Sequence, residues 1–393
     1  MSGDPTQGAD RHEDQVPDPD DERKPAKPSD LTKRSRLYVL RKTWREFGDD
    51  QCTDLAAALT YYSVLSIFPA AIALLSVLGV IGQAEESVDT VVEVLDPLVS
   101  PELLGNIAPI LRTLAESQSA GWLLVIGLLG ALYSASGYVG AFGRAMNRIY
   151  EIGEGRPIWK LRPTQVLITI VIIVLIALAL VMLAVTGPVA ESIGDVIGLG
   201  STAVLVWDIA KWPVVALVAL LVVALLYYST PNVQQPRFRW ISVGAAVALL
   251  IWLLASVGFT VYLANVANYN KTYGSLAGVV IALLFLWITN LALLFGAELD
   301  SELERGRQLQ AGMPAEEELQ LPARDTRNIK KAQKQEKKDI ALGRRIREES
   351  GKVWPPPDDR GHEHDGTAGT DPAEPTTTTD ATAGATGKHK ETP

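Results

Sequence analysis

The stretch Tyr273–Arg305, YGSLAGVVIALLFLWITNLALLFGAELDSELER, decides how the rest of the chain is interpreted. As an α-helix, its section from Ser275 to Ala297 is about 34 Å long, which exceeds the roughly 30 Å of a bilayer's hydrocarbon core. Asn290 lies deep inside this apolar run, where an unpaired amide is costly, so we expect it to face other helices. The stretch therefore predicts a membrane-spanning helix packed inside a bundle.

The whole chain has the composition of a membrane protein with polar ends. It has 393 residues, 48% of them hydrophobic, and a net charge of −9 that comes largely from the two ends. Its single cysteine, Cys52, excludes an intramolecular disulfide and a cysteine-based metal cluster. The first residues show no apolar signal peptide, so we expect targeting to come from the first internal span.

Six apolar stretches are long enough to cross a bilayer, and no alternating pattern of a β-barrel is present. The expected spans are residues 57–82, 120–142, 164–187, 204–229, 240–264 and 275–297. Pro69 lies near the middle of the first span and is expected to kink it. We predict an all-α polytopic integral membrane protein, with a six-helix membrane domain over residues 31–310.

The basic residues of the loops predict the orientation. Two loops, after the second and fourth spans, contain most of them: Arg144, Arg148, Arg156, Lys160, Arg162, Arg237 and Arg239. The opposite side has only Arg112, Lys211 and Lys271, of which Lys211 lies near the start of the fourth span. Because cytoplasmic loops carry the excess of Lys and Arg, both termini are predicted to be cytoplasmic, in a bacterial plasma (inner) membrane.

The segments outside the spans are polar or amphipathic. Residues 1–30 are predicted to be a disordered tail, too polar to bury anything. The following segment, to about residue 50, is predicted to be an amphipathic helix whose basic side chains meet anionic lipid headgroups, or else a solvated helix. The outer loop at 83–119 is predicted to form two short amphipathic helices.

The chain after the last span is charged and then of low complexity. Residues 311–353 are predicted to be a charged cytoplasmic helical segment. A solvated helix is the favoured interpretation there, and binding to anionic lipid or nucleic acid is the alternative. Residues 354–393 are predicted to be a disordered tail.

The membrane part offers little for catalysis. The four histidines all lie in the polar tails: His12, His362, His364 and His389. No P-loop, nucleophile motif or spacing typical of metal ligands is present. No catalytic residue, metal or cofactor is predicted, and the chain is not expected to be an enzyme.

Five polar or aromatic residues are candidates for lining a cavity. They are Asp54, Tyr61, Tyr62, Asn290 and Glu298. Asp54 and Tyr61 share a helix face, which is either interfacial or turned to the bundle interior. Asn290 and Glu298 lie about 12 Å apart along one helix and could border one cavity. The alternative for Glu298 is an ion pair with Arg148, Arg162 or Arg305.

Four separated segments resemble the YihY/BrkB family over about residues 35–310. They are ALTYYSVLSIFP, AMNRIYEIGEGRPIWKLRP, YYSTPNVQQPRFRWISVGA and the stretch quoted first. The resemblance implies a six-helix inner-membrane protein with cytoplasmic termini, and many members carry the older label ribonuclease BN. The matching positions include Tyr61, Pro69, Asn147, Tyr150, Arg156, Pro231, Asn232, Tyr273, Gly274, Trp287, Gly296, Glu298 and Leu299.

The expected function is transport of a small, anionic solute or a lipid-related precursor. Basic cytoplasmic loops would raise the local concentration of an anion. A non-transporting scaffold in envelope assembly or integrity is the alternative, and the ribonuclease label is not carried over. Transport predicts a water-accessible cavity beside Asn290 and Glu298, whereas a scaffold predicts that packing seals both. The expected partners are a bilayer with anionic headgroups and an unidentified small solute, with no nucleic acid; the oligomeric state is left open.

Overall fold

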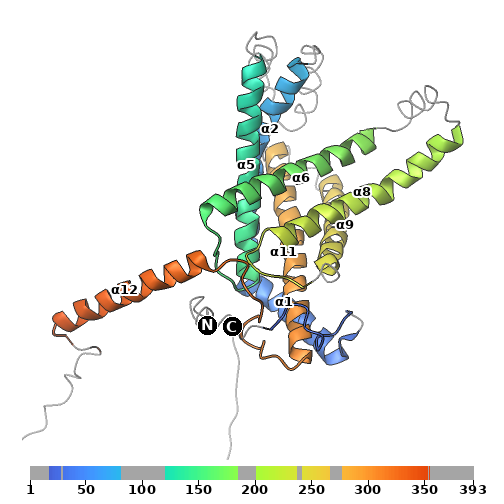
Figure 1. Cartoon of the computed structure of the whole chain (residues 1–393). Helices are drawn as coiled ribbons and strands as arrows, with labels where there is room; N and C mark the ends of the chain where they lie inside the picture. The colour runs from blue at the N-terminus through green and yellow to red at the C-terminus, as the bar shows by residue number, and fades with distance from the viewer. Residues whose placement is uncertain are drawn as a thin grey trace, which may run out of the picture. The chain divides into compact units, whose positions relative to one another are not determined.

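A computed structural model describes residues 17–27, 30–80, 120–184, 201–236, 241–265, 277–352 and 354. Over these ranges the chain is helical, apart from connecting segments and one isolated β-bridge between Val233 and Ala323. The helices are α1 (Lys33–Asp49), α2 (Cys52–Val80), α5 (Ala120–Ile149), α6 (Ile158–Ala184), α8 (Ser201–Ser229), α9 (Ile241–Asn265), α11 (Ala277–Gln310) and α12 (Arg327–Glu349) (Figure 1). The all-α prediction is confirmed for the described ranges.

Four of the described helical stretches are long and apolar enough to cross a membrane: Ile158–Ala179, Ile209–Ser229, Val243–Leu263 and Ala277–Gln310. Helices α2 and α5 coincide with the other two expected spans. The expected outer loop at 83–119 lies outside the described residues, and so do Tyr273 and Gly274. The count of six spans therefore remains a prediction.

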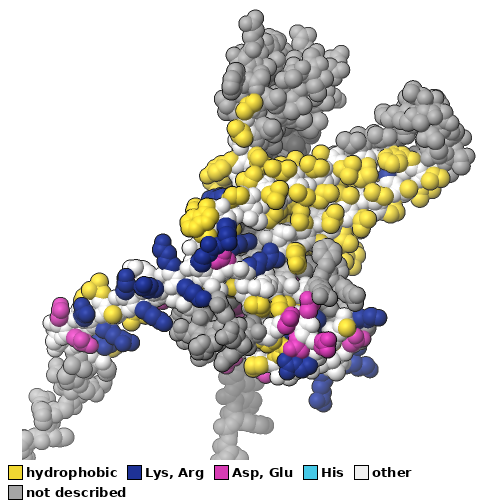
Figure 2. All heavy atoms as spheres, viewed as in Figure 1, with side chains coloured by type: hydrophobic (Ala, Val, Ile, Leu, Met, Phe, Trp, Pro, Cys, Tyr) yellow, Lys and Arg dark blue, Asp and Glu magenta, His cyan; other side chains and the backbone are white. Residues whose placement is uncertain are grey.

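The outer surface of the spans is apolar. Figure 2 shows hydrophobic side chains covering the visible sides of α6 and α8. Ile173 and Val174 of α6 are 46% and 61% exposed, and Leu217 of α8 is 63% exposed. Such a continuous apolar surface is rare on a soluble monomer and suits contact with lipid chains.

The chain divides into two compact units, Met1–Glu336 and Lys337–Pro393. Helix α11 lies at the centre of the first unit. It packs against α1, α2, α5 and α9, and Figure 1 shows α2 and α5 running side by side. The buried core of this unit includes Leu59, Phe142, Tyr227 and Leu294, from four different helices. Helices from distant parts of the sequence thus surround much of α11.

Two glycines allow the backbones of α9 and α11 to approach closely. A Cβ on Gly244 of α9 would lie 2.2 Å from the carbonyl oxygen of Gly296 on α11, and a Cβ on Gly296 would lie 2.4 Å from that of Gly244. Two backbones approach this closely only where neither residue has a side chain. The family position Gly296 therefore has a packing role.

Residues 17–27, a described part of the predicted N-terminal tail, contact α11 through Lys24 and Pro25. Lys24 is 4% exposed, and its Nζ lies 2.9 Å from Oε1 of Glu304 on α11. The carbonyl oxygen of Pro25 accepts a hydrogen bond from Nε of Arg307 at 3.1 Å. Composition suggested that this segment buries nothing, but a buried partner charge on α11 stabilises the buried lysine.

Helix α12 is shorter than the predicted segment 311–353. Helix α11 ends at Gln310, and the connection to Arg327 is not helical. Met313, Ala315 and Leu321 of this connection are 5%, 0% and 7% exposed. The connection is therefore a folded part of the first unit, because these apolar side chains find buried positions there.

Candidate functional site

Asn290 lies in a polar contact between three helices. Its Nδ2 donates to Oγ1 of Thr60 on α2 at 3.1 Å, and its Oδ1 accepts from the hydroxyl of Tyr138 on α5 at 2.9 Å. Thr60 in turn donates to the carbonyl oxygen of Ala56 at 2.8 Å. Asn290 is 2% exposed, so the expectation that it faces other helices agrees with its position.

Glu298 lies two turns further along α11, in a second polar contact. It is 1% exposed, and its Oε1 accepts from Sγ of Cys52 at 3.5 Å. Its carboxyl group also lies close enough to that of Asp50 for the two charges to interact. Two neighbouring carboxyl groups repel each other when both are ionised, which favours a proton on one of them. The pair is therefore a place where the protein can hold a proton.

The turn between α1 and α2 positions this second contact. Gln51 has a φ of 55°, a left-handed conformation that is uncommon for a residue other than glycine. The turn places Asp50 at the end of α1 and Cys52 at the start of α2, both beside Glu298. Local backbone strain at functional sites is a recognised pattern, although strain alone does not identify one.

Asp50 connects the buried pair to the surface. Its side chain is 21% exposed, and its Oδ1 lies 3.5 Å from Nε of Arg148. Burial raises the pKa of Asp50 to about 6, and the positive charge of Arg148 acts in the opposite direction. The expected ion pair between Glu298 and Arg148 is thus replaced by an indirect link through Asp50.

Arg305, another expected partner of Glu298, pairs with other carboxylates. Its Nε lies 2.9 Å from Oε1 of Glu302, and its Nη2 lies 2.8 Å from Oε1 of Glu151. Arg305 is 1% exposed and also donates to the carbonyl oxygen of Ala315 at 2.9 Å. This network ties the end of α11 to the end of α5 and to the connection that follows.

Asp54 and Tyr61 are exposed, so the structure does not bring them to the interior beside Asn290. Tyr62 is half-buried on α2 and contacts Arg144 of α5, whose Nη2 donates to its hydroxyl at 3.3 Å. Of the five candidates, Asn290 and Glu298 are the two that lie deep in the bundle. A helix face predicted from spacing alone does not say which side of the bundle it meets.

Sequence reasoning missed Asp50 and Cys52 as neighbours of Glu298, and Thr60 and Tyr138 as the partners of Asn290. A signal existed for the second pair, since Thr60 and Tyr138 are polar groups within apolar spans. No comparable signal marked Asp50, which lies in an ordinary charged turn of the sequence.

The asparagines of the family motifs form a separate structural cluster. Oδ1 of Asn147 accepts from the backbone N–H of Asn232 at 2.7 Å, and Nδ2 of Asn147 donates to Glu154 at 3.1 Å. Nδ2 of Asn232 donates to the carbonyl oxygens of Gly153 and Asp325, each at 2.9 Å. These bonds join three segments that are distant in the sequence.

Three more motif positions belong to the same region. Arg156 donates from Nη2 to Glu154 and to the carbonyl oxygen of Thr230, each at 2.7 Å. Pro231 and Tyr150 of the same motifs are buried. The matched residues therefore satisfy backbone groups at the ends of α5 and α8, which is a structural role.

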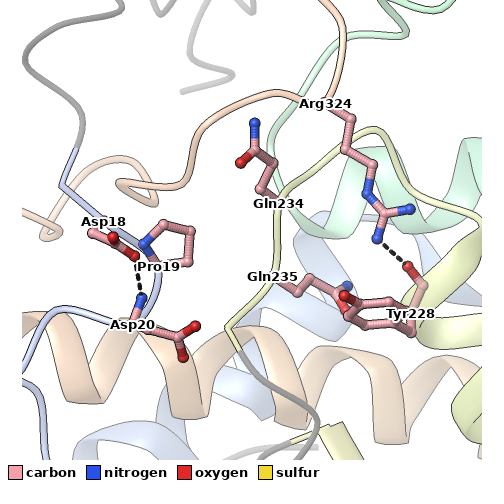
Figure 3. Close-up of a pocket in the computed structure, with 7 residues that line it drawn as sticks. All are labelled: Asp18, Pro19, Asp20, Tyr228, Gln234, Gln235 and Arg324. Carbon is pink, nitrogen blue, oxygen red and sulfur yellow. Dashed lines mark hydrogen bonds between the residues drawn. The ribbon is translucent and has the colours of Figure 1, made fainter.

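A polar pocket of about 340 Å³ lies where the N-terminal segment meets the α8–α9 connection. Figure 3 shows Asp18 and Asp20 on one side and Arg324 and Tyr228 on the other, with Gln235 between them. The Arg324 guanidinium lies 5.1 Å from the centre of the Tyr228 ring and donates to two backbone carbonyl oxygens. Arg324 thus holds the end of α8 and the segment that follows it.

Within the residues that the structure describes, no three His, Cys, Asp or Glu side chains are grouped so that they could hold a metal ion. The candidate site therefore rests on two polar contacts along α11. Asn290 forms the first with α2 and α5, and Glu298 forms the second with the α1–α2 turn. Their chemistry is that of hydrogen bonding and proton binding.

Comparison with known proteins gives a consistent family. The sequence model of the family described as virulence factor BrkB matches residues 43–319. A ribonuclease-like protein named YfkH, from Bacillus subtilis strain 168, is 29% identical over 273 residues, which are 70% of this chain and 98% of YfkH. No solved structure matches the chain.

Two further relatives are named only as UPF0761 membrane proteins. The one from Stenotrophomonas maltophilia strain R551-3 is 28% identical over 67% of this chain and 60% of its own length. The one from Alkalilimnicola ehrlichii is 27% identical over 68% of this chain and 57% of its own length. The chain thus spans less than two thirds of the length of these two relatives.

Proposed function

The chain belongs to the virulence factor BrkB family and is an integral membrane protein, and we propose that it is a transporter of a small, anionic solute or lipid-related precursor. One observation carries the proposal: α11 buries an amide and a carboxyl group among apolar helices, at Asn290 and Glu298. Polar and ionisable groups at such depth are costly, and they commonly mark solute or proton pathways. We include in the proposal six spans, a bacterial plasma membrane and cytoplasmic termini.

The charge of the solute is inferred from the surroundings of the second contact. Arg148 and Arg144 lie one turn apart on α5, near the exposed side of Asp50 and of Tyr62. Positive charges at the mouth of a path raise the local concentration of an anion and its rate of entry. A proton held by the pair of Asp50 and Glu298 would respond to the charge of a solute that reaches it.

A scaffold in envelope assembly is the second candidate, and one observation favours it. Asn290 and Glu298 are 2% and 1% exposed, and each has side-chain partners. This is the sealed arrangement that a purely structural role requires. If the protein is a transporter, this arrangement is a closed state, and the helices around Asn290 and Glu298 must separate to admit a solute.

Ribonuclease activity is not proposed. Its support is the printed name of one relative that is 29% identical to this chain. The histidines that could act as general acids or bases lie at positions 12, 362, 364 and 389, all outside the region matched by the family.

The test compares solute levels inside and outside cells that lack the protein with cells that produce it at equal membrane abundance. Variants Asn290→Ala and Glu298→Gln are compared with the wild type. Thr289→Val is the matched control, since Thr289 is next to Asn290 but bonds to Phe285 and Trp252 instead. The proposal expects a solute whose distribution follows the wild type and the control but not the two variants.

The scaffold makes the opposite prediction. If both variants restore every defect of the deletion and no solute differs between the strains, transport through these residues is excluded. Deletion of the loop at 83–119 would then be the change that causes harm.

A further inference from the structure

Helix α12 carries its positive charge on one side. At about 100° per residue, eight of its nine Lys and Arg residues fall within an arc of about 140°. This set, the basic strip, consists of Arg327, Lys330, Lys331, Lys334, Lys337, Lys338, Arg344 and Arg345. Every member of the strip is exposed, and Figure 2 shows Lys and Arg side chains gathered along this helix.

The remaining charges of α12 are arranged differently. Glu336 and Asp339 lie on the side opposite the basic strip, while Glu348 and Glu349 follow in the last turn on the strip side. A solvated helix gains from mixing its charges at spacings of three and four, because opposite charges then pair along one face. Before its last turn, α12 instead keeps the two signs on different sides, which suits a helix with an anionic partner on one side.

The start of α12 is fixed close to a membrane span. The backbone N–H of Asn328 donates to the carbonyl oxygen of Gly155 at 3.0 Å, and its Nδ2 donates to that of Arg156 at 2.8 Å. The candidate span Ile158–Ala179 begins two residues after Arg156. The attachment of α12 beside this span therefore keeps its first turns close to the bilayer surface, which raises the effective concentration of lipid headgroups around them.

We propose that the basic strip binds the anionic headgroups of the bilayer that contains the protein. Charge complementarity identifies the occupant: clustered Lys and Arg next to a membrane span are attracted to anionic lipid, and the attraction increases with each added cation. From Arg327 to Arg345 the strip offers charges along about 27 Å of helix, which suits contact with a flat surface of opposite charge. Nucleic acid is a different occupant that the experiment must separate.

Two alanines report on the two sides of the helix. Ala341 lies in the middle of the basic strip, and Ala332 lies on the opposite side; both are exposed. Each is replaced singly, as Ala341→Cys or Ala332→Cys, in the full chain and labelled with a nitroxide. Cys52 is 0% exposed and stays in place. Accessibility to a water-soluble nickel relaxation reagent is measured in nanodiscs with and without phosphatidylglycerol.

The proposal expects the label at 341 to lose accessibility roughly tenfold in anionic discs, while the label at 332 changes little. High salt should restore the accessibility at 341, because it screens exposed charges. Lys330→Gln, Lys334→Gln and Lys337→Gln combined should abolish the loss. The same three positions changed to Arg form the matched control and should keep it.

Three results would overturn the proposal. The first is equal accessibility at 341 in neutral and anionic discs. The second is a loss of accessibility that persists in the triple Gln variant. The third is protection of 341 by RNA in neutral discs without protection by anionic lipid, which would identify the strip as a nucleic-acid surface.

Discussion

At the scale of single residues, α11 holds two polar groups in different ways. Asn290 has a donor and an acceptor partner from two neighbouring helices, so its amide is satisfied. Glu298 instead meets a thiol and a second carboxyl group, and Asp50 links it to the surface. The hydrogen bonds of Asn290 join uncharged groups and do not change near neutral pH. The contact of Glu298 with Asp50 depends on whether one of the two carboxyl groups is protonated.

The first prediction concerns Asp50, which faces Arg148, Glu298, Glu46 and Glu151. Its folded pKa of about 6 lies above its ordinary 3.8, so protonation favours the folded state. This stabilisation is complete below about pH 4 and is lost as the pH rises through 6. Asp50→Asn should remove the dependence and make the variant more stable at pH 7, by on the order of 1–3 kcal/mol.

Thermal unfolding of the detergent-solubilised protein at pH 4.5 and pH 7 measures this effect. The quantity of interest is the difference between the two pH values for Asp50→Asn, compared with that of the wild type. The idea fails if the wild type and the variant show the same change in melting temperature.

At the scale of elements, the α9–α11 crossing rests on two glycines. A Cβ at Gly296 would meet Ala248 at 2.6 Å and the Tyr227 hydroxyl at 2.7 Å, besides the backbone of Gly244. The helices must separate to accept it, so Gly296→Ala should destabilise the protein by about 1–3 kcal/mol or more. Gly244→Ala should act similarly, because it meets the same backbone from the other side.

Gly258 on α9 provides the matched control, since a Cβ there would meet nothing within 4 Å. Gly258→Ala should leave the melting temperature unchanged or raise it, because alanine favours a helix over glycine. Equal melting temperatures for Gly296→Ala and Gly258→Ala would show that the close crossing does not form.

At the scale of the whole molecule, the segment before α1 is fastened to the far end of α11. The Nζ of Lys24 is enclosed with Glu304, and the side chain of Gln310 bonds to the backbone of Asp30 and Thr32. Leu31 is 1% exposed and packs with Leu299 and Leu303 of α11. The N-terminal segment before residue 43, which lies outside the family match at 43–319, thus completes the packing of α11.

The third prediction compares two neighbouring cations in this segment. Lys24→Gln removes a buried charge partner and should loosen the segment, at a cost of about 3 kcal/mol. Arg23→Gln removes an ion pair between Arg23 and Asp21. The Arg23 side chain is 67% exposed, so the loss of this pair should cost little stability. Limited proteolysis with an enzyme that cuts between residues 17 and 27 should be faster for Lys24→Gln alone. Equal rates for the two variants would contradict the docking of the segment.

The sequence by itself determined the helical class, the apolar spans and the family, because these depend on local composition, on periods of 3.6 residues and on motifs within one stretch. It also marked Asn290 and Glu298, since a polar group in an apolar run is visible without a structure. Only the tertiary structure decided their partners. Asp50, Thr60 and Tyr138 reach α11 from distant segments, and their contacts depend on how the helices pack.

The same distinction applies to the burial of individual side chains. Lys24 lies in a polar, acidic segment whose composition indicates disorder, yet a buried carboxylate 280 residues away holds it. Asp54 and Tyr61 share a helix face, as their spacing predicts, but that face is exposed. Local pattern fixes which residues share a side of a helix, and only the packing of the other helices decides whether that side is buried, because burial belongs to the assembled bundle.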